Sequence, residues 1–330
     1  MGLKEYILKR TIYSVILVFF VISLNFVIFA LMPGDPLMSY VAGLKVRDEV
    51  HAKEILALFG LDKPLSERYV IYLRNMLTFD FGKSFFSKQA VSLEISTHLL
   101  NTLVLMGVST TFAIIIGVAL GIIAAYKRGG ALDTGLVTTS LVSYSFPVFW
   151  IGMIFIIIFF YQLHWFPIGR AYPLEWTNVG GWPTNPLQEL AGRIYHLFLP
   201  SFTLFLFSYG SWLLLTRACV LETITEDYVV TAKAKGLKER TILFKHVLKN
   251  ASLPIVTNVA LSFGFLISGA IITEAVFNYP GMGRLIWNAL ANSDMPVLQA
   301  IFFVIALCVI VANFMSDLLY GVLDPRVKYG

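Results

Sequence analysis

Six long stretches without Asp, Glu, Lys or Arg constrain this chain more than any other feature of its sequence. Each is long enough to cross a bilayer as a helix, which takes about 20 mainly apolar residues. The chain is 57% hydrophobic and 14% charged, too apolar for a soluble globular domain. We therefore predict an all-α membrane protein with six transmembrane helices. The stretches are 11–34, 95–126, 134–163, 194–216, 250–273 and 295–316.

Lysine and arginine gather outside these stretches in a pattern that predicts orientation. They precede the first stretch, follow the second at Lys127 and Arg128, and recur through 217–253 and near the end of the chain. Cytoplasmic loops carry such an excess, whereas long loops cross the membrane largely regardless of charge. We expect a multi-pass protein with both termini cytoplasmic. The divisions are a transmembrane helix (1–34), an extracytoplasmic insertion (35–94), and a five-helix core (95–330) that includes the cytoplasmic loop 217–253.

The densest polar segment of the second half runs from Glu226 to Pro254 and reads EDYVVTAKAKGLKERTILFKHVLKNASLP. So many charges in lipid would cost tens of kcal/mol, at about 2.5 to 3.5 kcal/mol each near mid-bilayer. Its apolar residues recur at helical spacing and predict an amphipathic helix. The small side chains just before them would let a second protein surface approach the helix backbone closely. The alternative is a connector without a partner. The apolar set is Leu243, Phe244, Val247 and Leu248, and the small set is Ala232, Ala234 and Gly236.

The motifs of several enzyme classes are missing from the sequence. There is no GxxxxGK[ST] for nucleotide phosphates, no HExxH and no GxSxG. Cys219 and Cys308 are interpreted as inert apolar residues. We expect no catalytic residue, no metal site and no cofactor bound by this chain, so any driving energy has to come from another protein.

Six motifs occur in an order that resembles the peptide class of binding-protein-dependent ABC transporter permeases. They extend along almost the whole chain, with 170–192 as the weakest part. The motifs are PGDP (33–36), GLDKPL (60–65), SFPVFWIG (145–152), DYVVTAKAKGL (227–237), PGMGRL (280–285) and LDPRVKYG (323–330). The resemblance is to the first-type permease subunit of the dipeptide, oligopeptide and nickel branch, and it implies the type I ABC importer permease fold.

The resemblance also implies a coupling segment in the loop 217–253. In this family a short helix docks on an ATPase subunit, and its motif leads to a glycine and later to Leu-Pro. The corresponding residues are Val230, Thr231, Ala232, Ala234, Gly236, Leu253 and Pro254. The chain has Val230 where the short consensus has Glu, as is usual in the peptide branch.

The partners implied by the resemblance are a second permease subunit, two ABC ATPases and an extracytoplasmic solute-binding protein. ATP and magnesium belong to the ATPases. Closure of the ATPases would move the helix around Thr231–Gly236 as a rigid lever, and the spans would open the path outward. The expected location is the cell (cytoplasmic or inner) membrane, and no nucleic acid is expected as a partner.

Pro147 predicts a kink in the third stretch, because proline frees a backbone carbonyl. Ser145, Phe146 and Pro147 are therefore candidates for lining the translocation path, with simple helix packing as the alternative. Gly117 and Gly121, four residues apart, predict close helix packing.

Two other classes of membrane protein fit the sequence less well. A secondary active transporter would need ionisable residues well inside the spans, and Glu274 and Asp317 are interpreted instead as ends that reach water. A redox subunit would need histidine ligands within the spans. The solute is left open among dipeptides, oligopeptides, nickel chelates and oligosaccharides. Trp165, Trp176 and Trp182 fit either an interfacial belt or a surface for a sugar ring.

Overall fold

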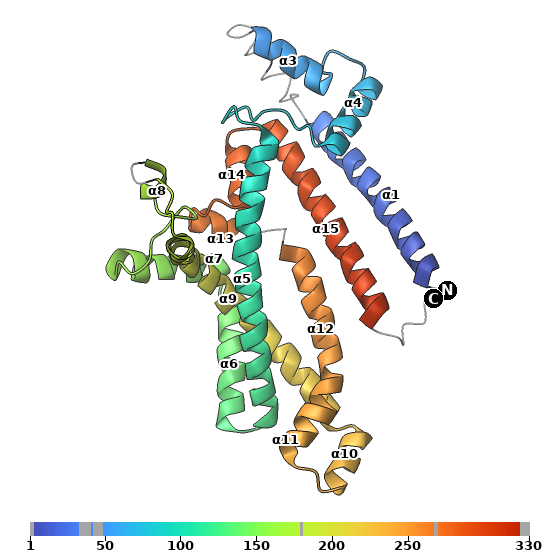
Figure 1. Ribbon diagram of the computed structural model, residues 1–330, viewed down its shortest axis with the longest axis vertical. Helices are drawn as coiled ribbons and strands as arrows, with labels where there is room; N and C mark the ends of the chain where they lie inside the picture. The colour runs from blue at the N-terminus through green and yellow to red at the C-terminus, as the bar shows by residue number, and fades with distance from the viewer. Residues whose placement is uncertain (1–2, 33–40, 42–48, 179–180, 267–269, 324–330) are drawn as a thin grey trace. The chain divides into compact units, whose positions relative to one another are not determined.

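A computed structural model describes residues 3–32, 41, 49–178, 181–266 and 270–323, almost all of them in helices (Figure 1). The PGDP motif and residues 324–330 of the last motif lie outside the described residues. The helices are α1 (Leu3–Ala30), α3 (Glu49–Phe59), α4 (Leu65–Thr78), α5 (Val91–Tyr126), α6 (Ala131–Ser145), α7 (Val148–Phe155), η1 (Ile156–Gln162), α8 (Glu175–Asn178), α9 (Pro186–Ile224), α10 (Asp227–Ala234), α11 (Glu239–Thr241), η2 (Ile242–Val247), α12 (Leu248–Phe265), α13 (Ile271–Val276), α14 (Met282–Ala291) and α15 (Met295–Leu323).

Four of these helices are long and apolar enough to cross a membrane: Glu5–Ala30, Val91–Tyr126, Pro186–Ile224 and Met295–Met315. They coincide with four of the six predicted stretches. A fifth candidate is the pair α6 and α7–η1, bent by 94° between Ser145 and Val148. The kink predicted at Pro147 is thus confirmed, and it turns the chain by about a right angle. The stretch 250–273 covers most of α12 and also residues 267–269, which lie outside the described residues. The count of six spans therefore stays a prediction.

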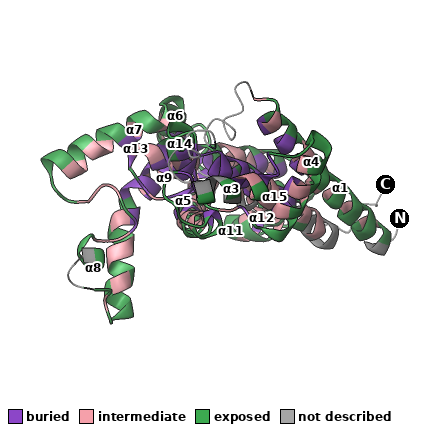
Figure 2. Cartoon of the chain, turned by 90° about the horizontal axis from the view of Figure 1, so that it is seen from above, coloured by how far each residue is buried: buried purple, intermediate pink, exposed green. Residues whose placement is uncertain are grey.

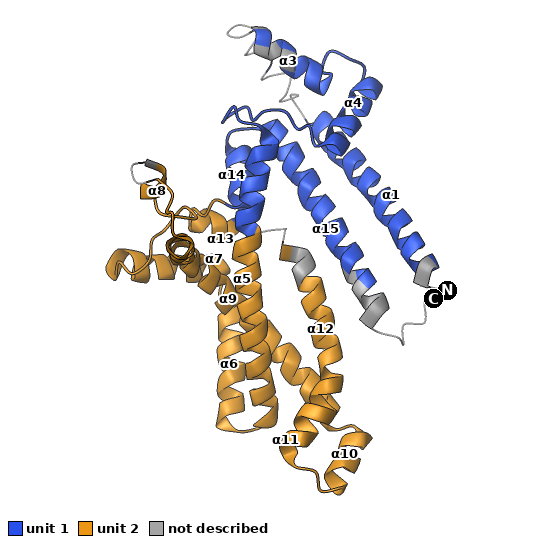
Figure 3. Cartoon of the chain, in the orientation of Figure 1, with its two compact units in different colours: residues 1–102, 267–271, 281–330 blue, residues 103–266, 272–280 orange. Residues whose placement is uncertain are grey.

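The chain divides into two compact units, and the boundary passes through α5 and α13 (Figure 3). Unit 1 comprises Met1–Thr102, Ile267–Ile271 and Gly281–Gly330, and unit 2 comprises Leu103–Leu266 and Ile272–Pro280. Many residues on the membrane-length helices are exposed, as expected where lipid or a partner protein is the surrounding medium (Figure 2).

Unit 1 is built on the pairing of α1 with α15, with α3, α4 and α14 packed around their ends. Its core includes Ile22, Phe26, Tyr72 and Phe303. Inside it, the Asn25 side-chain amide donates a 2.9 Å hydrogen bond to the Gln299 backbone carbonyl. Such a bond compensates for burying an amide. At the other end of the pair, Arg10 forms an ion pair with Asp317.

A buried carboxylate in unit 1 holds the loop that follows α4. Asp294, 2% exposed, immediately precedes α15. It accepts hydrogen bonds from the Ser84 hydroxyl at 2.5 Å, the Phe85 N–H at 3.0 Å and the Phe86 N–H at 3.2 Å. Three donors compensate for removing the charge from water, so the loop is anchored to the turn between α14 and α15.

Unit 2 depends on close approach of α9 to two neighbouring helices. A Cβ atom at Gly121 of α5 would lie 2.6 Å from the Leu213 carbonyl oxygen of α9. A Cβ atom at Gly210 of α9 would lie 2.8 Å from the Ser140 carbonyl oxygen of α6. Only glycine permits such contacts between helix backbones. The close packing predicted from Gly117 and Gly121 is confirmed, since Gly117 also faces α9 at Trp212.

One expectation about an acidic residue was wrong. Glu274 was expected to reach water, but it is completely buried in α13, at 0% exposure. Asp317 keeps 20% of its side chain exposed while paired with Arg10. The sequence placed Glu274 at the border of an apolar stretch, but the segment after it folds back, with the Tyr279 N–H donating to the Glu274 backbone carbonyl and with Phe277 and Tyr279 buried as well.

Candidate coupling site

The candidate site begins where α9 ends and turns into the short helix α10 (Figure 1). One face of α10 is fixed to unit 2, because Val229 and Ala232 are buried at 0% and 4% exposure. They pack in one cluster with Ile242, Val247 and Ala251 of the following helices. Burial of this face gives α10 a fixed orientation on its own chain.

The opposite face of α10 is exposed and has short side chains. Val230 is 56% exposed, and Thr231 and Ala234 are exposed as well. The Thr231 hydroxyl donates a 2.9 Å hydrogen bond to the Asp227 carbonyl, so it is folded back onto its own helix. The result is a low surface of short side chains, with the exposed Asp227 at its start, on a helix whose other face is packed against its own chain.

Gly236 ends α10 in the left-handed region, with φ of +72°. The Gly236 N–H donates to the Lys233 carbonyl at 2.9 Å, and the Leu237 N–H donates to the Ala232 carbonyl at 3.4 Å. These bonds satisfy carbonyls that the helix end would leave free. A Cβ atom at Gly236 would meet no atom of the described chain within 4 Å. The glycine is therefore required by its backbone angle, while the space beside it stays open.

A groove of about 280 Å³ lies beside α10. Its rim includes Lys233 and Glu239, and Tyr126 at the end of α5 donates a 2.6 Å hydrogen bond to the Glu239 carboxylate. That bond ties α5 to the segment after Gly236. The lining residues are Tyr126, Ile224, Val229, Lys233, Leu237, Glu239, Ile242, Leu243 and Val247.

The amphipathic helix predicted after Gly236 buries or partly buries three of its four expected apolar residues, Leu243, Val247 and Leu248, and exposes the fourth. Phe244 is 64% exposed, whereas Ile242 and Val247 are buried at 6% and 1%. The reason is that 242–247 forms a π-helical turn, η2. Its i→i+5 pattern places residues five apart on one side. Leu243 and Leu248 are partly buried against the same cluster, as predicted.

The structure brings only some of the predicted coupling residues together. Val230, Thr231, Ala234 and Gly236 lie exposed on or just after α10, and Ala232 lies beneath them. Leu253 and Pro254 lie in α12, both exposed, and Pro254 continues the helix instead of ending it.

The candidate path residues surround the bend between α6 and α7. The Ser145 hydroxyl donates to the Leu141 carbonyl at 2.7 Å, and the exposed Phe146 ring stacks on Trp150 at 5.5 Å. Pro147 precedes the first residue of α7. Farther along α7, a Cβ atom at Gly152 would lie 2.9 Å from the Phe277 ring. These residues mark a fixed bend, and their role in a path stays a prediction.

Aromatic side chains of the tryptophan-rich loop pack against an arginine side chain of α9. The Arg193 guanidinium lies 5.8 Å from the Tyr172 ring centre and 5.4 Å from that of Trp182. Trp176 and Trp182 also contact each other, at 5.4 Å. Trp165 lies against Phe159 at 5.9 Å, and both Trp165 and Trp182 keep about half of their surface exposed, so the role of these rings stays a prediction.

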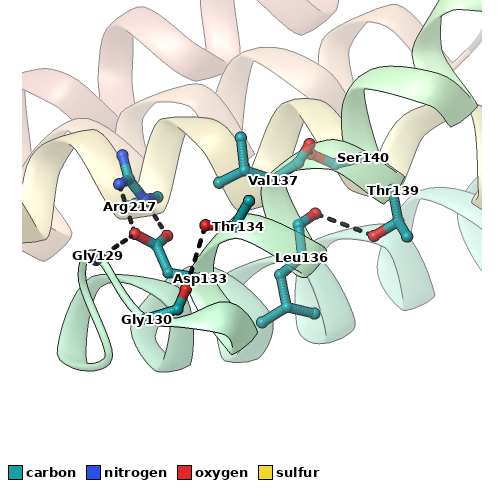
Figure 4. A network of polar contacts seen from close by, with 9 residues as sticks. All are labelled: Gly129, Gly130, Asp133, Thr134, Leu136, Val137, Thr139, Ser140 and Arg217. Carbon is teal, nitrogen blue, oxygen red and sulfur yellow. Dashed lines mark hydrogen bonds and ion pairs between the residues drawn. The ribbon is translucent and has the colours of Figure 1, made fainter.

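Sequence reasoning missed one polar contact near the site. Arg217 of α9 forms an ion pair with Asp133 of α6, and the Gly129 N–H joins them (Figure 4). The only signal in the sequence was an acidic residue soon after the basic turn, and 84 residues separate it from Arg217.

Among the described residues, the helices long and apolar enough to cross a bilayer define a helical, multi-pass membrane protein. Comparison with known families gives its class. Residues 117–329 match the model of the binding-protein-dependent transport system inner membrane component, and residues 3–106 match that of the corresponding N-terminal membrane component. The chain belongs to this family of permease subunits.

Individual relatives cover nearly the whole chain. It is 35% identical to the oligopeptide transport system permease protein AppB of Bacillus subtilis, over 99% of this chain and 100% of the relative. It is 36% identical to the di/tripeptide permease protein DppB of Pseudomonas aeruginosa, over 94% and 95%. It is 35% identical to the glutathione permease protein GsiC of Pectobacterium atrosepticum, over 98% and 99%. The resemblance to peptide-class ABC permeases predicted from the motifs is confirmed.

Proposed function

We propose that this chain is the first-type permease subunit of an ATP-driven importer for peptides, and that α10 around Thr231–Gly236 couples it to ATPase subunits. The observation that carries the proposal is the exposed, low face of α10, which is supported from behind by buried residues and ends in a glycine open to one side. Such a face suits close docking of a rigid partner.

The proposed assembly follows from the family. A second permease would form the path together with this chain, two ATPases would bind ATP and magnesium, and a binding protein would deliver the solute from outside. Six spans, an extracytoplasmic segment 35–94 and cytoplasmic termini complete the proposal. Three relatives are named for oligopeptides, di/tripeptides and glutathione, which favours a peptide over a nickel chelate or an oligosaccharide.

Replacing Gly236 with tryptophan tests the coupling role. The open space beside Gly236 in this chain lets the protein insert and accumulate, although the left-handed angle costs about 1–2 kcal/mol for a residue with a side chain. We expect peptide uptake to be lost while ATPases still hydrolyse ATP, because the indole occupies the surface where the partner docks. Uptake with radiolabelled peptide, normalised to membrane abundance, measures this.

Two variants control for the backbone angle. Gly181→Trp changes a glycine with similar φ, +65°, and similarly open space, but far along the chain from α10. It is expected to transport normally. Gly236→Asn keeps a residue that tolerates the left-handed angle and is expected to retain partial uptake. Normal uptake by Gly236→Trp at normal abundance would count against the proposed function.

Labelling from outside the cell tests the proposed orientation. Lys238 is exposed just before α11, and Gln89 is exposed in the segment 35–94. In a background with Cys219→Ala and Cys308→Ala, an impermeant maleimide is expected to label Gln89→Cys in sealed cells and Lys238→Cys only after permeabilisation. Labelling of Lys238→Cys in sealed cells would reverse the orientation.

The solute is tested with the binding protein encoded alongside this chain. Its thermal midpoint is expected to rise with di- and oligopeptides, because a ligand that binds only the folded state stabilises it. A rise with oligosaccharides or nickel chelates alone would replace the peptide assignment.

A further inference from the structure

The Asp133 carboxylate joins three segments of unit 2 at one point (Figure 4). Arg217 of α9 donates from Nε to Oδ1 at 2.7 Å and from Nη2 to Oδ2 at 2.9 Å. The Gly129 N–H, in the turn between α5 and α6, donates to Oδ2 at 2.9 Å. The Asp133 side chain is only 6% exposed. Both carboxylate oxygens of Asp133 therefore accept from donors of this chain. We call the contacts of Asp133 with Arg217 and Gly129 the joint, because they tie α6 to α9 and to the α5–α6 turn.

Local sequence explains why the joint forms. Asp133 lies in the first turn of α6, where a negative charge is favoured by the helix dipole. Gly129, with φ of +76°, turns the chain so that its N–H reaches back to the carboxylate. Arginine supplies the planar fork that fits both carboxylate oxygens at once.

The joint lies close to the candidate coupling helix along the chain. Arg217 precedes Ile224, the last residue of α9, by two helical turns, and only Thr225 and Glu226 separate α9 from α10. Upstream, the backbone contacts at Gly121 and Gly210 hold α9 against α5 and α6. The ion pair adds a polar attachment to α6 at Arg217, directly after Thr216, so α9 is held on both neighbours two turns before it ends.

We propose that Asp133 and Arg217 are positioning residues for coupling, which make the α5–α6 turn and the start of α10 move as one body. Displacement of α10 by an ATPase is then passed to α5 and α6 directly, instead of being absorbed by bending at the end of α9. This inference rests on the proposed function of α10.

Transport per ATP hydrolysed, in the reconstituted importer with its partners, tests the inference. Asp133→Asn is expected to lower this ratio severalfold, because the neutral amide cannot accept from both Arg217 nitrogen atoms and from the Gly129 N–H. Arg217→Lys keeps the charge but not the fork, and is expected to fall between the wild type and Asp133→Asn. A role in folding alone would reduce the amount of complex and leave the ratio unchanged, which would overturn the inference.

The matched control is another Arg–carboxylate pair on the same helix. Arg193 and Glu189 of α9 are 2.9 Å apart, but the pair is within one helix and about 40% exposed, at 41% and 38%. Exposed pairs of this kind contribute little. Glu189→Gln is expected to keep the wild-type ratio, and a fall equal to that of Asp133→Asn would overturn the inference.

A distance measurement reports the joint itself. Spin labels at Arg128→Cys and Lys235→Cys, both exposed positions, are placed in the Cys219→Ala, Cys308→Ala background. We expect one narrow distance distribution that is the same without nucleotide and with trapped ATP, and a distribution that shifts with ATP when Asp133→Asn is added. A shift of equal size in both proteins would overturn the inference. Failure of the wild-type complex to take up peptide at all would instead remove the proposed function.

Discussion

Gly121→Leu is expected to reduce the folded protein recovered from membranes severalfold, because α5 can no longer lie against α9. Even a Cβ atom there would be 2.6 Å from the Leu213 carbonyl oxygen and 2.7 Å from Thr216 Cβ. Overpacking by a few methyl groups typically costs about 1–3 kcal/mol, and here one of the opposing atoms is backbone. The measurements are the monodisperse fraction in detergent and the thermal midpoint.

The same helix supplies a matched control for that substitution. A Cβ atom at Gly107 of α5 would meet nothing within 4 Å. Gly107→Leu is therefore expected to behave as the wild type, although it adds the same side chain to the same apolar helix. Equal losses from both variants would show that glycine matters in α5 for a reason other than contact with α9.

Asp294→Ala is expected to release the loop between α4 and α5 from the turn before α15. The substitution leaves two buried donors, the Ser84 hydroxyl and the Phe85 N–H, without their acceptor, whereas the Phe86 N–H keeps the Ser84 hydroxyl oxygen at 3.2 Å. At about 1–3 kcal/mol for each buried unsatisfied group, the free energy of unfolding is expected to fall by about 2–6 kcal/mol. Limited proteolysis in nanodiscs is expected to cut between residues 79 and 90 well before it cuts the wild type.

A second serine–carboxylate pair in the same region serves as the comparison. Ser87 donates to Glu94, and that contact is exposed. Glu94→Ala is expected to leave the cleavage rate close to that of the wild type, because water replaces the lost partner. Comparable cleavage of the two variants would mean that burial of Asp294 does not hold the loop.

Long apolar helices were the part of the fold best predicted from sequence. The stretch 95–126 ends with α5 at Tyr126, and 194–216 lies inside α9. Lipid imposes this outcome, since a spanning segment has to satisfy every backbone group internally. Pro147 also predicted its bend correctly, because proline removes a donor and clashes with the preceding turn.

Details that depend on contacts between distant segments could not be predicted. Phe244 and Val247 fit one helical face by 3.6-residue spacing, but a π-helical turn exposes the first and buries the second. Glu274 is buried by packing that no local pattern encodes.

The candidate site, too, could be predicted from the sequence only in part. The short side chains of α10 and the glycine that ends it could be found from the motif alone. The left-handed angle of Gly236, the burial of Ala232 and the contacts of Asp133 depend on the three-dimensional fold and are visible only in the structure. Leu253 and Pro254 belong to the family motif, yet they lie within a separate helix, α12.

The length of α9 determines how its two ends can move when the helix lies in a membrane. Its 39 residues extend about 58 Å at about 1.5 Å per residue, nearly twice the roughly 30 Å thickness of the hydrocarbon layer. Arg193 and Arg217, 24 residues apart, are separated by about 36 Å along that axis. If the helix tilts about a point between them, the aromatic loop at one end and the start of α10 at the other swing in opposite directions.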